Sequence, residues 1–558
     1  MYRTLFLVSF SLLFLQQLSP QTYYKFAVFF ADKGSNNPHS ISDPTTFLSQ
    51  RAIERRSRYN ISITEQDLPV NPSYVQGVMS VSGNISIVNR SRWFNYLMIG
   101  TYDSAVVTSI AALPYVSQIK LLYRGNYPQK LQPGKGNQPD GGTKSLSGSI
   151  ENLNYGNAKT QTEMIGLDYL HRKGYLGQDM VIAVLDGGFL FVDQMPAFDH
   201  LRAGNRILGT WDFAANEESV YEDNNHGTNV LSCMAAFIDG KMLGTAPMAS
   251  YWLLRTEDVF SETIVEEYNW VSGAEFADSV GADLINSSLG YTTFDNGIED
   301  HTYADMNGNT SVATRGADVA AAKGILVVNS AGNSGNSAWK YIGAPADGDS
   351  VLTVGAVKNN REKATFSSFG PSADGRVKPN VCAMGQGASV VGVGGEVISA
   401  NGTSFSSPIL CGAVACLWQK HRQEKNNMDV IRAVEKCSNL YNVPNDGMGY
   451  GIPNLGVADM LLSQTPFDQY FENQEIKVYP NPVGDQTFYV DFYAQLTENI
   501  LIEITSVKGK KLYSQEKQVY QKTMNTLVLN TDAKLGAGVY VLVIHTHNKR
   551  FSTKFVKS

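Results

Sequence analysis

The chain has 558 residues, more than a single domain usually contains, so two to four domains are expected. Hydrophobic residues make up 43% of the chain and charged residues 17%, a balance typical of globular domains and not of disordered chains. The net charge of -7 and the scattered lysines and arginines argue against a nucleic-acid partner.

The N-terminus has the features of an export signal. Arg3 supplies a positive charge, residues 5–15 are apolar, and residues 16–21 form the more polar region that follows the apolar run of a signal peptide. The apolar run is too short to span a bilayer comfortably, and no later segment reaches the ~18 consecutive apolar residues of a membrane helix. We therefore expect residues 1–21 to be a signal peptide, with a membrane anchor as the alternative, and the chain to have no transmembrane segment.

Residues 22–150 are expected to form a small α+β domain followed by a linker. The region contains both strands and helices: strands are predicted at 23–30, within 84–102 and at 116–123, and helices at 43–59, 73–81 and 104–113. From about 125 to 155 the composition shifts to Gly, Pro, Gln, Asn, Ser and Lys, which is typical of an exposed linker that proteases cut readily.

Apolar strands alternate with helices from about 160 to 462. The strands are continuous apolar runs, which indicates a parallel sheet that helices cover on both faces. Ligands are expected at the carboxyl ends of such strands. The predicted strands are 181–185, 251–254, 284–286, 325–328 and 351–354, and the predicted helices are 264–280 and 311–323.

The last part of the chain is expected to be all β. Residues 463–475 form a second polar linker, and beyond it apolar and other residues alternate with a period of two. Hairpin turns are predicted at 508–509 and 547–548. A small β-sandwich over 476–558 is the simplest fold in which such strands bury their apolar faces against one another.

One polar stretch, residues 401–408, leads into the apolar segment 409–418. Ser404 would lie at the N-terminus of a helix, where unpaired backbone N–H groups and the positive end of the helix dipole favour a developing oxyanion. Pro408 suits the first turn of that helix. Taken alone, Ser404 could equally be a helix cap.

Three further polar residues are candidates for a functional site because of their positions at strand ends and at a helix start. Asp186 follows the strand 181–185, and Asn333 lies just past the strand 325–328, so both are expected at the same edge of the sheet. His226 comes just before an apolar helical stretch. Separately, Asp186 and Asn333 could be turn residues. Together with Ser404, they supply a carboxylate, an imidazole, a hydroxyl and an amide in a single chain order.

This constellation resembles the subtilisin-like serine proteases, over about 160–462. The matching stretches are Leu185-Asp186-Gly187-Gly188, His226-Gly227-Thr228, Ala331-Gly332-Asn333-Ser334-Gly335 and Gly402-Thr403-Ser404-Phe405-Ser406-Ser407-Pro408. The resemblance implies that Ser404 is the nucleophile, His226 the general base and acid, and Asp186 its orienting carboxylate. It also implies that Asn333 and the Ser404 N–H bind the oxyanion.

The resemblance also extends to the substrate site. The stretch 286–290, with Ser288, Leu289 and Gly290, matches the family's substrate-binding strand, which would pair with an extended peptide by β-addition. Gly343 and Trp339 are candidates for shaping the pocket at the scissile bond.

Two residues depart from the family pattern. Gly187 stands where relatives usually carry Thr or Ser, and Phe405 stands where they carry Met. Neither position carries a charge that the chemistry needs. Asn286 and Asn401 match glycosylation sequons, but both are expected inside the catalytic cleft, so no glycan is expected there.

The flanking regions carry resemblances of their own. Residues 22–150, including 47–56, resemble an inhibitory propeptide of bacterial subtilases, and its linker would then be cut autocatalytically. A permanent binding domain is the alternative. Residues 476–558 resemble the sorting domains of the type IX secretion system, with carbohydrate binding as the alternative. The motifs are Val478-Tyr479-Pro480-Asn481-Pro482, Leu535-Gly536-Ala537-Gly538-Val539-Tyr540 and Lys554-Phe555-Val556-Lys557.

The sequence therefore predicts an exported serine endopeptidase, secreted or at a bacterial cell surface. Its partners would be protein or peptide substrates and the secretion machinery. Its regions would be a signal peptide at 1–21, an inhibitory propeptide at 22–150, a subtilisin-like catalytic domain at 155–463 and a β-sandwich sorting domain at 476–558. A catalytically inactive, subtilase-like surface binding protein is the alternative.

Cofactors and cysteines give weaker signals. No cofactor is expected to be required, although relatives often bind structural calcium. Asp305, Asn307 and Asn309 have loop-like spacing without the Gly and Glu of an EF-hand, which favours a solvated loop. Of the five cysteines, buried thiols are expected for most, and Cys416 with Cys437 is the disulfide to test.

Overall fold

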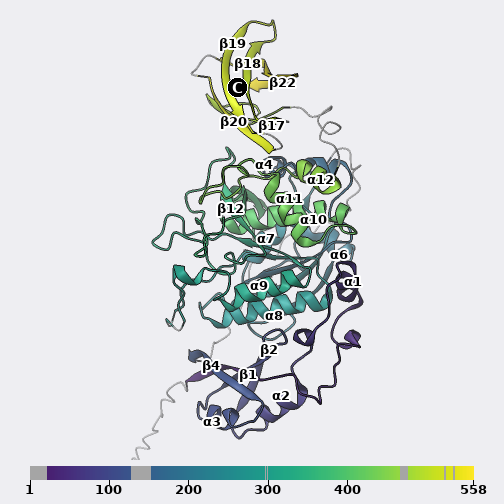
Figure 1. Ribbon diagram of the computed structural model, residues 1–558, viewed down its shortest axis with the longest axis vertical. Coiled ribbons are helices and arrows are strands. Elements are labelled where there is room, and N and C mark those ends of the chain that lie inside the picture. Colours follow the sequence, from purple (N-terminus) through teal and green to yellow (C-terminus); the bar gives the residue numbers. More distant parts are fainter. Residues whose placement is uncertain are drawn as a thin grey trace, which may run out of the picture.

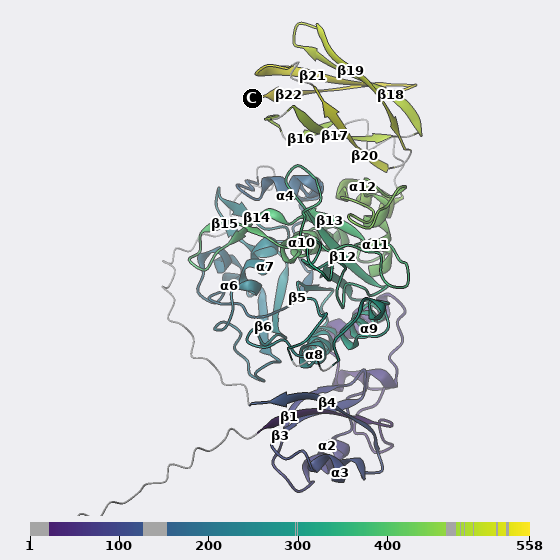
Figure 2. The ribbon, with the colours of Figure 1, turned by 90° about the vertical axis from the view of Figure 1, so that its left-hand side faces the viewer.

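The computed structural model describes residues 22–126, 153–295, 297, 299–464, 476–479, 481–484, 486–494, 496–520, 523–531 and 535–558. Three bodies follow one another along the long axis of the molecule: an N-terminal domain, a central domain and a C-terminal domain (Figures 1 and 2). The expected signal peptide and most of both linkers lie outside the described residues.

The N-terminal domain is an α+β sandwich, as predicted. Its antiparallel sheet has the strand order β2-β3-β1-β4. One face packs on helices α2 and α3, and the other face, with Ala27, Tyr96 and Met98, joins the core of the central domain. The elements are β1 (Tyr23–Phe30), α1 (Gln50–Arg58), α2 (Pro72–Met79), β2 (Ile85–Ser91), β3 (Tyr96–Thr101), α3 (Val106–Ala111) and β4 (Val116–Gly125).

The helix expected over 43–59 begins only at Gln50. The side chain of Ser49 accepts a hydrogen bond from the N–H of Ala52, which makes Ser49 the N-cap of α1. The residues before this cap form a separate short 3₁₀ helix, Pro44–Thr46. A capping serine inside the amphipathic stretch therefore divides it into two pieces.

The central domain contains the predicted parallel sheet, with seven strands in the order β13-β12-β11-β10-β5-β9-β6. Every neighbouring pair in it is parallel. The five predicted strands are confirmed, and β6 and β13 are additions. The bounds are β5 (Val181–Asp186), β6 (Ile207–Asp212), β9 (Ser250–Arg255), β10 (Leu284–Ser287), β11 (Leu326–Ser330), β12 (Val351–Val357) and β13 (Val381–Met384).

Helices cover both faces of this sheet. Successive residues of β5 point to opposite faces, so Ile182 and Val184 share a core with α7 (His226–Ala235) and α10 (Thr403–His421). Val181 and Ala183 share another core with α8 (Val265–Val280) and α9 (Val312–Ala322), which lie on the side of the N-terminal domain (Figure 2). The remaining elements are α4 (Lys159–Met164), α5 (Leu167–Arg172), α6 (Asp199–Ala203), β7 (Phe237–Ile238), β8 (Met242–Leu243), β14 (Gln386–Val391), β15 (Val397–Asn401), α11 (Asn427–Lys436) and α12 (Leu455–Ser463).

The C-terminal domain is a β-sandwich, as predicted. One sheet has the order β16-β17-β20 and the other β19-β18-β21-β22, and both predicted hairpin turns are present. A bidentate ion pair ties it to the central domain: Arg361 donates to the two carboxylate oxygens of Asp491 at 3.0 and 2.9 Å. The strands are β16 (Lys477–Tyr479), β17 (Thr487–Ala494), β18 (Glu498–Ser506), β19 (Lys511–Val519), β20 (Thr523–Asn530), β21 (Gly538–His545) and β22 (Arg550–Lys557).

The disulfide considered between Cys416 and Cys437 is wrong. All five cysteines are free and buried. The Cys416 thiol lies midway along α10 and donates to the carbonyl of Thr245 at 3.2 Å, whereas the Cys437 thiol donates to the carbonyl of Val434 at 3.1 Å. Each thiol thus has its own backbone acceptor, as expected of a small buried polar group.

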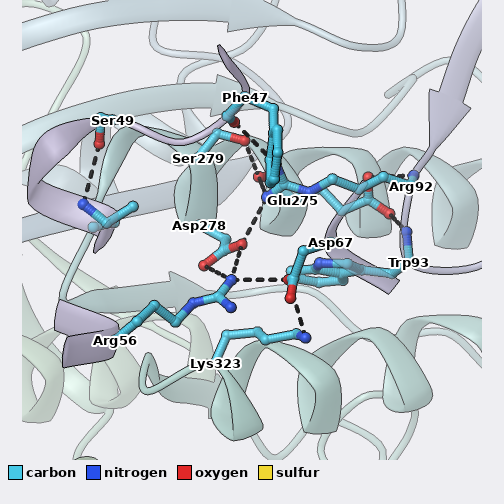
Figure 3. A network of polar contacts seen from close by, with 12 residues as sticks. Phe47, Ser49, Arg56, Asp67, Arg92, Trp93, Glu275, Asp278, Ser279 and Lys323 are labelled. Carbon is cyan, nitrogen blue, oxygen red and sulfur yellow. Dashed lines mark hydrogen bonds and ion pairs between the residues drawn. The ribbon is translucent and has the colours of Figure 1, made fainter. Parts of the chain in front are cut away.

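Buried charges join the N-terminal domain to α8 (Figure 3). The carboxylate of Asp278 is fully buried, and Arg56 and Arg92 donate to it at 2.8 and 2.6 Å, with Arg55 as a third donor. Burial alone would raise the pKa of Asp278, but the charges of the three arginines outweigh burial and lower it. Next to it, Glu275 accepts the backbone N–H groups of Arg92 and Trp93 at 2.8 and 3.1 Å.

Candidate active site

The predicted carboxylate and imidazole are in direct contact. Asp186 is the last residue of β5 and His226 is the first of α7, and His226 Nδ1 lies 2.7 Å from Asp186 Oδ1. Asp186 is fully buried, whereas the His226 side chain is 37% exposed. A carboxylate at Nδ1 requires an N–H there, so Nε2 of the neutral ring is the atom that can accept a proton.

The pKa of His226 follows from the same contact. Burial lowers it, but the negative charge of Asp186 and the hydrogen bond to that carboxylate outweigh burial, and Glu257 adds to their effect. The net result is a pKa raised above the ordinary value of histidine. Asp186 therefore stabilises the protonated, charged form of the His226 ring.

Glycines allow the backbone around this pair to approach closely. A Cβ on Gly227 would come within 2.4 Å of the carbonyl oxygen of Gly188. Gly188 has a φ of +145°, and a Cβ there would lie 2.9 Å from backbone atoms of Asn224. The side chain of Asn224 in turn accepts the N–H of His226 at 2.7 Å. The Asp-Gly-Gly stretch is thus the surface on which the start of α7 packs, and not only a turn.

Gly187 stands where subtilisin-like proteases usually carry Thr or Ser, and a neighbouring side chain fills the space that this leaves. A Cβ on Gly187 would lie 2.8 Å from Cγ1 of Val259, so Val259 occupies the space in which a larger residue would sit. The N–H of Gly187 donates to Asp186 Oδ1 at 2.8 Å. The backbone therefore still supports the carboxylate.

Ser404 lies inside a helix and is not its cap. α10 begins at Thr403, and the cap position belongs to Gly402. As the second residue of the helix, Ser404 has no intrahelical acceptor for its N–H, which can point at an oxyanion. The second departure, Phe405, forms a wall of the site, with its ring centroid 6.2 Å from that of His226.

Pro408 does not lie in the first turn of α10, as was predicted, but inside the helix. Because proline has no N–H, the carbonyl oxygen of Ser404 lacks its usual helical donor four residues later. The hydroxyl of Ser288 donates to that oxygen at 2.8 Å instead. The residue that follows β10 therefore supports the backbone at Ser404.

Asn333 is held with its amide oxygen toward α10. Its Oδ1 accepts the N–H of Thr403 at 2.9 Å and the Thr403 hydroxyl at 3.0 Å. The Thr403 hydroxyl also accepts the N–H of Gly332 at 3.2 Å. These bonds direct the NH₂ end of the exposed Asn333 side chain away from Thr403. The amide is thus available as a donor beside Ser404.

The expected substrate-binding residues also come together. Tyr291, which follows Gly290, exchanges backbone hydrogen bonds with Ala344, next to Gly343, at 2.8 and 3.1 Å. Leu289 and Gly290 are at least partly accessible, whereas Ser288 is buried. The Ser288 side chain, which was expected in the substrate site, therefore points to the start of α10 and supports the backbone there. Trp339 Nε1 donates to the carbonyl of Ile342 at 3.1 Å, beside Gly343.

The two sequons differ. Asn286 is fully buried and accepts a hydrogen bond from the Ser407 hydroxyl at 3.0 Å, as its expected place in the cleft requires. Asn401 is exposed at the end of β15, and its Oδ1 accepts the N–H of Gly387 at 2.8 Å. The burial argument against a glycan therefore holds for Asn286 and is wrong for Asn401.

The loop considered for calcium uses its oxygens internally. Asp305 Oδ2 accepts the N–H and hydroxyl of Thr302 at 2.8 and 2.7 Å, and Asn307 Oδ1 accepts the N–H of Asn309 at 2.9 Å. Across the described ranges, no three His, Cys, Asp or Glu side chains gather as ligands for a metal ion. A solvated loop accounts for these contacts.

Family models match three parts of the chain. Residues 25–136 match a peptidase S8 propeptide domain of Bacteroidota, and residues 477–558 match a secretion system C-terminal sorting domain. The latter is the type IX sorting signal that the sequence predicted, so the chain is a secreted or cell-surface protein. Where the chain is described, none of its helices combines the length and apolarity needed to span a bilayer.

The third model, that of the subtilase family, matches residues 177–451. Subtilisin NAT of Bacillus subtilis subsp. natto is 33% identical over 258 residues, which are 45% of this chain and 58% of that protein. The chain thus spans little more than half of this relative. The subtilisin of Bacillus pumilus is 32% identical over 45% of this chain and 81% of its own length. A crystal structure of MycP1 with its N-terminal propeptide removed aligns with a TM-score of 0.43 and 19% identity, over 54% of this chain and 96% of that one. The predicted resemblance is confirmed, and the chain belongs to the subtilase family.

Proposed function

We propose that this protein is a serine endopeptidase that cleaves peptide bonds through Ser404, His226 and Asp186. The observation that carries the proposal is the 2.7 Å contact between His226 Nδ1 and the buried Asp186 carboxylate, and Ser404 is the second residue of α10. An imidazole held in this way can take the proton of a serine hydroxyl near neutral pH.

The reaction would proceed in two halves. Ser404 Oγ attacks the scissile carbonyl carbon while His226 Nε2 takes the hydroxyl proton, and Asp186 stabilises the imidazolium. The negative charge on the carbonyl oxygen would be met by the Asn333 amide and the Ser404 N–H. His226 then gives its proton to the leaving amine, which leaves an acyl group on Ser404. Water activated by His226 hydrolyses this ester and restores the serine.

The substrate would bind as an extended peptide. Leu289 and Gly290 follow the buried β10 and are accessible, and Gly343 lies beside them through the Tyr291–Ala344 bridge. Backbone pairing to such a segment gives affinity that does not depend on the peptide's side chains. Side-chain preference must then come from the cavities around this segment.

The N-terminal domain would keep the enzyme inactive until the linker is cut. Its match to a propeptide family and its buried arginine contacts with Asp278 support this role. In a host without other proteases, Ser404→Ala protein should stay uncut, because autocatalysis needs the nucleophile. Normal processing of that variant would favour a permanent binding domain or an external protease.

The C-terminal domain would be the part of the enzyme that the secretion machinery recognises. Deleting residues 476–558 should leave the protein in the periplasm, and unchanged export would contradict the assignment.

The proposed chemistry requires no cofactor, because side chains of the chain carry out each step. Structural calcium remains a prediction, which thermal unfolding with and without a chelator would test.

A fluorophosphonate probe separates the enzyme from an inactive binding protein. Such probes react with serine only when a base activates it, so the processed protein should be labelled and Ser404→Ala protein should not. Absence of labelling in processed, folded protein would contradict the proposed activity. No feature in the described parts of the chain favours the inactive alternative.

A further inference from the structure

A cavity of about 540 Å³ lies beside His226. Its lining is acidic: all the residues on its wall belong to the described chain, none is a lysine or arginine, and five are carboxylates, namely Glu257, Asp258, Glu262, Glu266 and Asp295. Leu289 also lines it. The cavity thus lies between the proposed general base and the segment that would hold the substrate backbone. A peptide bound for cleavage must place a side chain in or next to it.

Glu257 is the carboxylate that makes this cavity unusual. It is 8% exposed, and its Oε1 accepts the hydroxyl of Tyr291 at 2.6 Å and that of Thr256 at 3.2 Å. No described residue donates a hydrogen bond to its Oε2. The side chain is therefore fixed in place by one oxygen, while the other lies unpaired at the wall of the cavity.

Several buried carboxylates elsewhere in this chain have a basic partner. Asp278 is paired with three arginines, Asp212 with Arg255 and Asp491 with Arg361. Glu257 has neither lysine nor arginine within ion-pair distance among the described residues. A buried charge without a partner is costly, and a cation that enters the cavity would remove that cost.

The neighbouring acids add to this cost. Burial raises the pKa of Glu257, and the charges of Glu262 and Asp186 add to that shift against the hydrogen bonds from Tyr291 and Thr256. Glu266, whose two oxygens accept the N–H groups of Asp258 and Thr263 at 2.9 and 2.8 Å, also has a raised pKa. A positive charge in the cavity would relieve the repulsion between these groups.

Two acids of this cavity act on the charge of a lysine in the N-terminal domain. Lys25 on β1 is half-buried, and burial lowers its pKa while the charges of Asp258 and Glu266 oppose that shift. Its ammonium lies over the ring of Tyr123, 5.8 Å from the centroid. A lysine on which these acids act thus comes from a domain that is expected to leave.

We propose that the cavity is a specificity pocket for a lysine or arginine side chain of the substrate, and that Glu257 selects it. The inference rests on the proposed peptidase activity. It assigns the protein to substrates that carry a basic residue near the cleaved bond. The unpaired Oε2 of Glu257 would receive a charge-assisted hydrogen bond from the substrate's ammonium or guanidinium group.

Matched fluorogenic peptides would test the pocket on the processed enzyme. Each peptide pair differs at one position near the cleaved bond and carries either lysine or norleucine, which has nearly the same shape without the charge. At one position kcat/KM should be about 10-fold to 100-fold higher for lysine, the range expected for a hydrogen bond between charged groups. Equal values at every position would overturn the proposal.

Glu257→Gln tests the named residue. Glutamine keeps an oxygen for Tyr291 and Thr256 but removes the charge. The ratio of kcat/KM for the lysine peptide over the norleucine peptide should therefore fall toward one. The readout is the ratio of the two kcat/KM values, because the charge of Glu257 also raises the pKa of His226 and its loss changes both values alike. The same substitution at exposed Glu424 is the matched control and should change neither value. A lysine preference that survives in Glu257→Gln would overturn the role of Glu257.

Two further readouts distinguish the pocket assignment from the proposed activity and from a metal-ion site. If the enzyme reacts with the fluorophosphonate probe but shows no basic preference, the pocket assignment fails while the proposed activity stands. If neither probe nor peptides react, the proposed activity itself fails. If added Ca²⁺ abolishes the lysine preference at millimolar concentration and stabilises wild-type protein but not Glu257→Gln, the cavity is a cation site and the proposal is overturned.

The lysine preference should also depend on pH. Burial raises the pKa of Glu262 to about 7, with the charge of Asp295 adding to it, and that of Glu257 is raised as well. The pocket therefore gains negative charge as pH rises, and the ratio of kcat/KM for lysine over norleucine should rise between about pH 6 and pH 9. Titration of His226 affects both peptides alike and cancels in the ratio. A ratio that falls over this range would contradict the proposal.

Discussion

The hydroxyl of Ser288 donates a hydrogen bond to the carbonyl oxygen of Ser404 at 2.8 Å. This oxygen needs an outside donor because the residue one helical turn later, Pro408, has no N–H. The bond joins the segment after β10 to the start of α10, so the proposed nucleophile and the proposed substrate segment are held in one geometry.

We predict that Ser288→Ala destabilises the protein by about 1–3 kcal/mol, because it leaves a buried carbonyl without a donor. It should also lower kcat more than KM, since the Ser288 side chain points to the start of α10 and supports the backbone there. Ser288→Thr keeps the hydroxyl and should retain most of both properties. Urea unfolding and steady-state kinetics on the same preparations would check this, and an unchanged unfolding midpoint in Ser288→Ala would contradict it.

We expect Asn333→Asp to abolish most of the turnover without unfolding the site. Aspartate keeps the oxygen that accepts from the N–H and hydroxyl of Thr403, but it replaces the amide donor with a negative charge. The loss in kcat should reach at least the 10² to 10³ known for removal of the corresponding donor in subtilisin itself, about 2.7–4 kcal/mol. Asn333→Ala removes both contacts and should in addition lower the melting temperature. Comparable kcat for wild type and Asn333→Asp would exclude an oxyanion role.

The pH profile of kcat/KM should report the contact between His226 and Asp186. Only the neutral imidazole accepts a proton, so activity should rise with pH through the pKa of His226, which lies above its ordinary value. In Asp186→Asn the stabilising charge is lost while burial remains, so the rise should move to lower pH. The maximal rate should fall by about 10⁴, as for the equivalent change in other triads. A rise that moves to higher pH would contradict the attribution to Asp186.

Loss of the Asp278 carboxylate should release the N-terminal domain. In Asp278→Asn, three arginines keep their buried positions without the charge that they share, and breaking a buried pair in this way costs about 3–5 kcal/mol. We therefore expect the domain to bind at least about 100-fold more weakly. The measurement uses the Ser404→Ala chain, cut in the first linker by an added protease, and follows dissociation by size-exclusion chromatography. Asp446→Asn, at an exposed aspartate, is the control and should leave the complex intact.

Much of the fold follows from local patterns in the sequence. The central strands β5, β10, β11 and β12 are buried on both faces, so they appear as uninterrupted apolar runs that the sequence alone reveals. The strand ends then place Asp186 and Asn333 at one edge. β6 lies at the edge of the sheet, where only the side facing β9 is paired and most of its residues are half-buried, so its pattern was too weak to predict.

The sequence by itself determined which chemical groups the site contains and in what order, because short motifs with glycines mark the strand ends and helix starts. Tertiary structure alone decided how charges are partnered. Arg55 meets Asp278 across 223 positions of sequence, and Glu257 is left without a basic partner beside His226. Pairing of buried charges depends on distances between elements that are far apart in the chain, and no local pattern of residues carries that information.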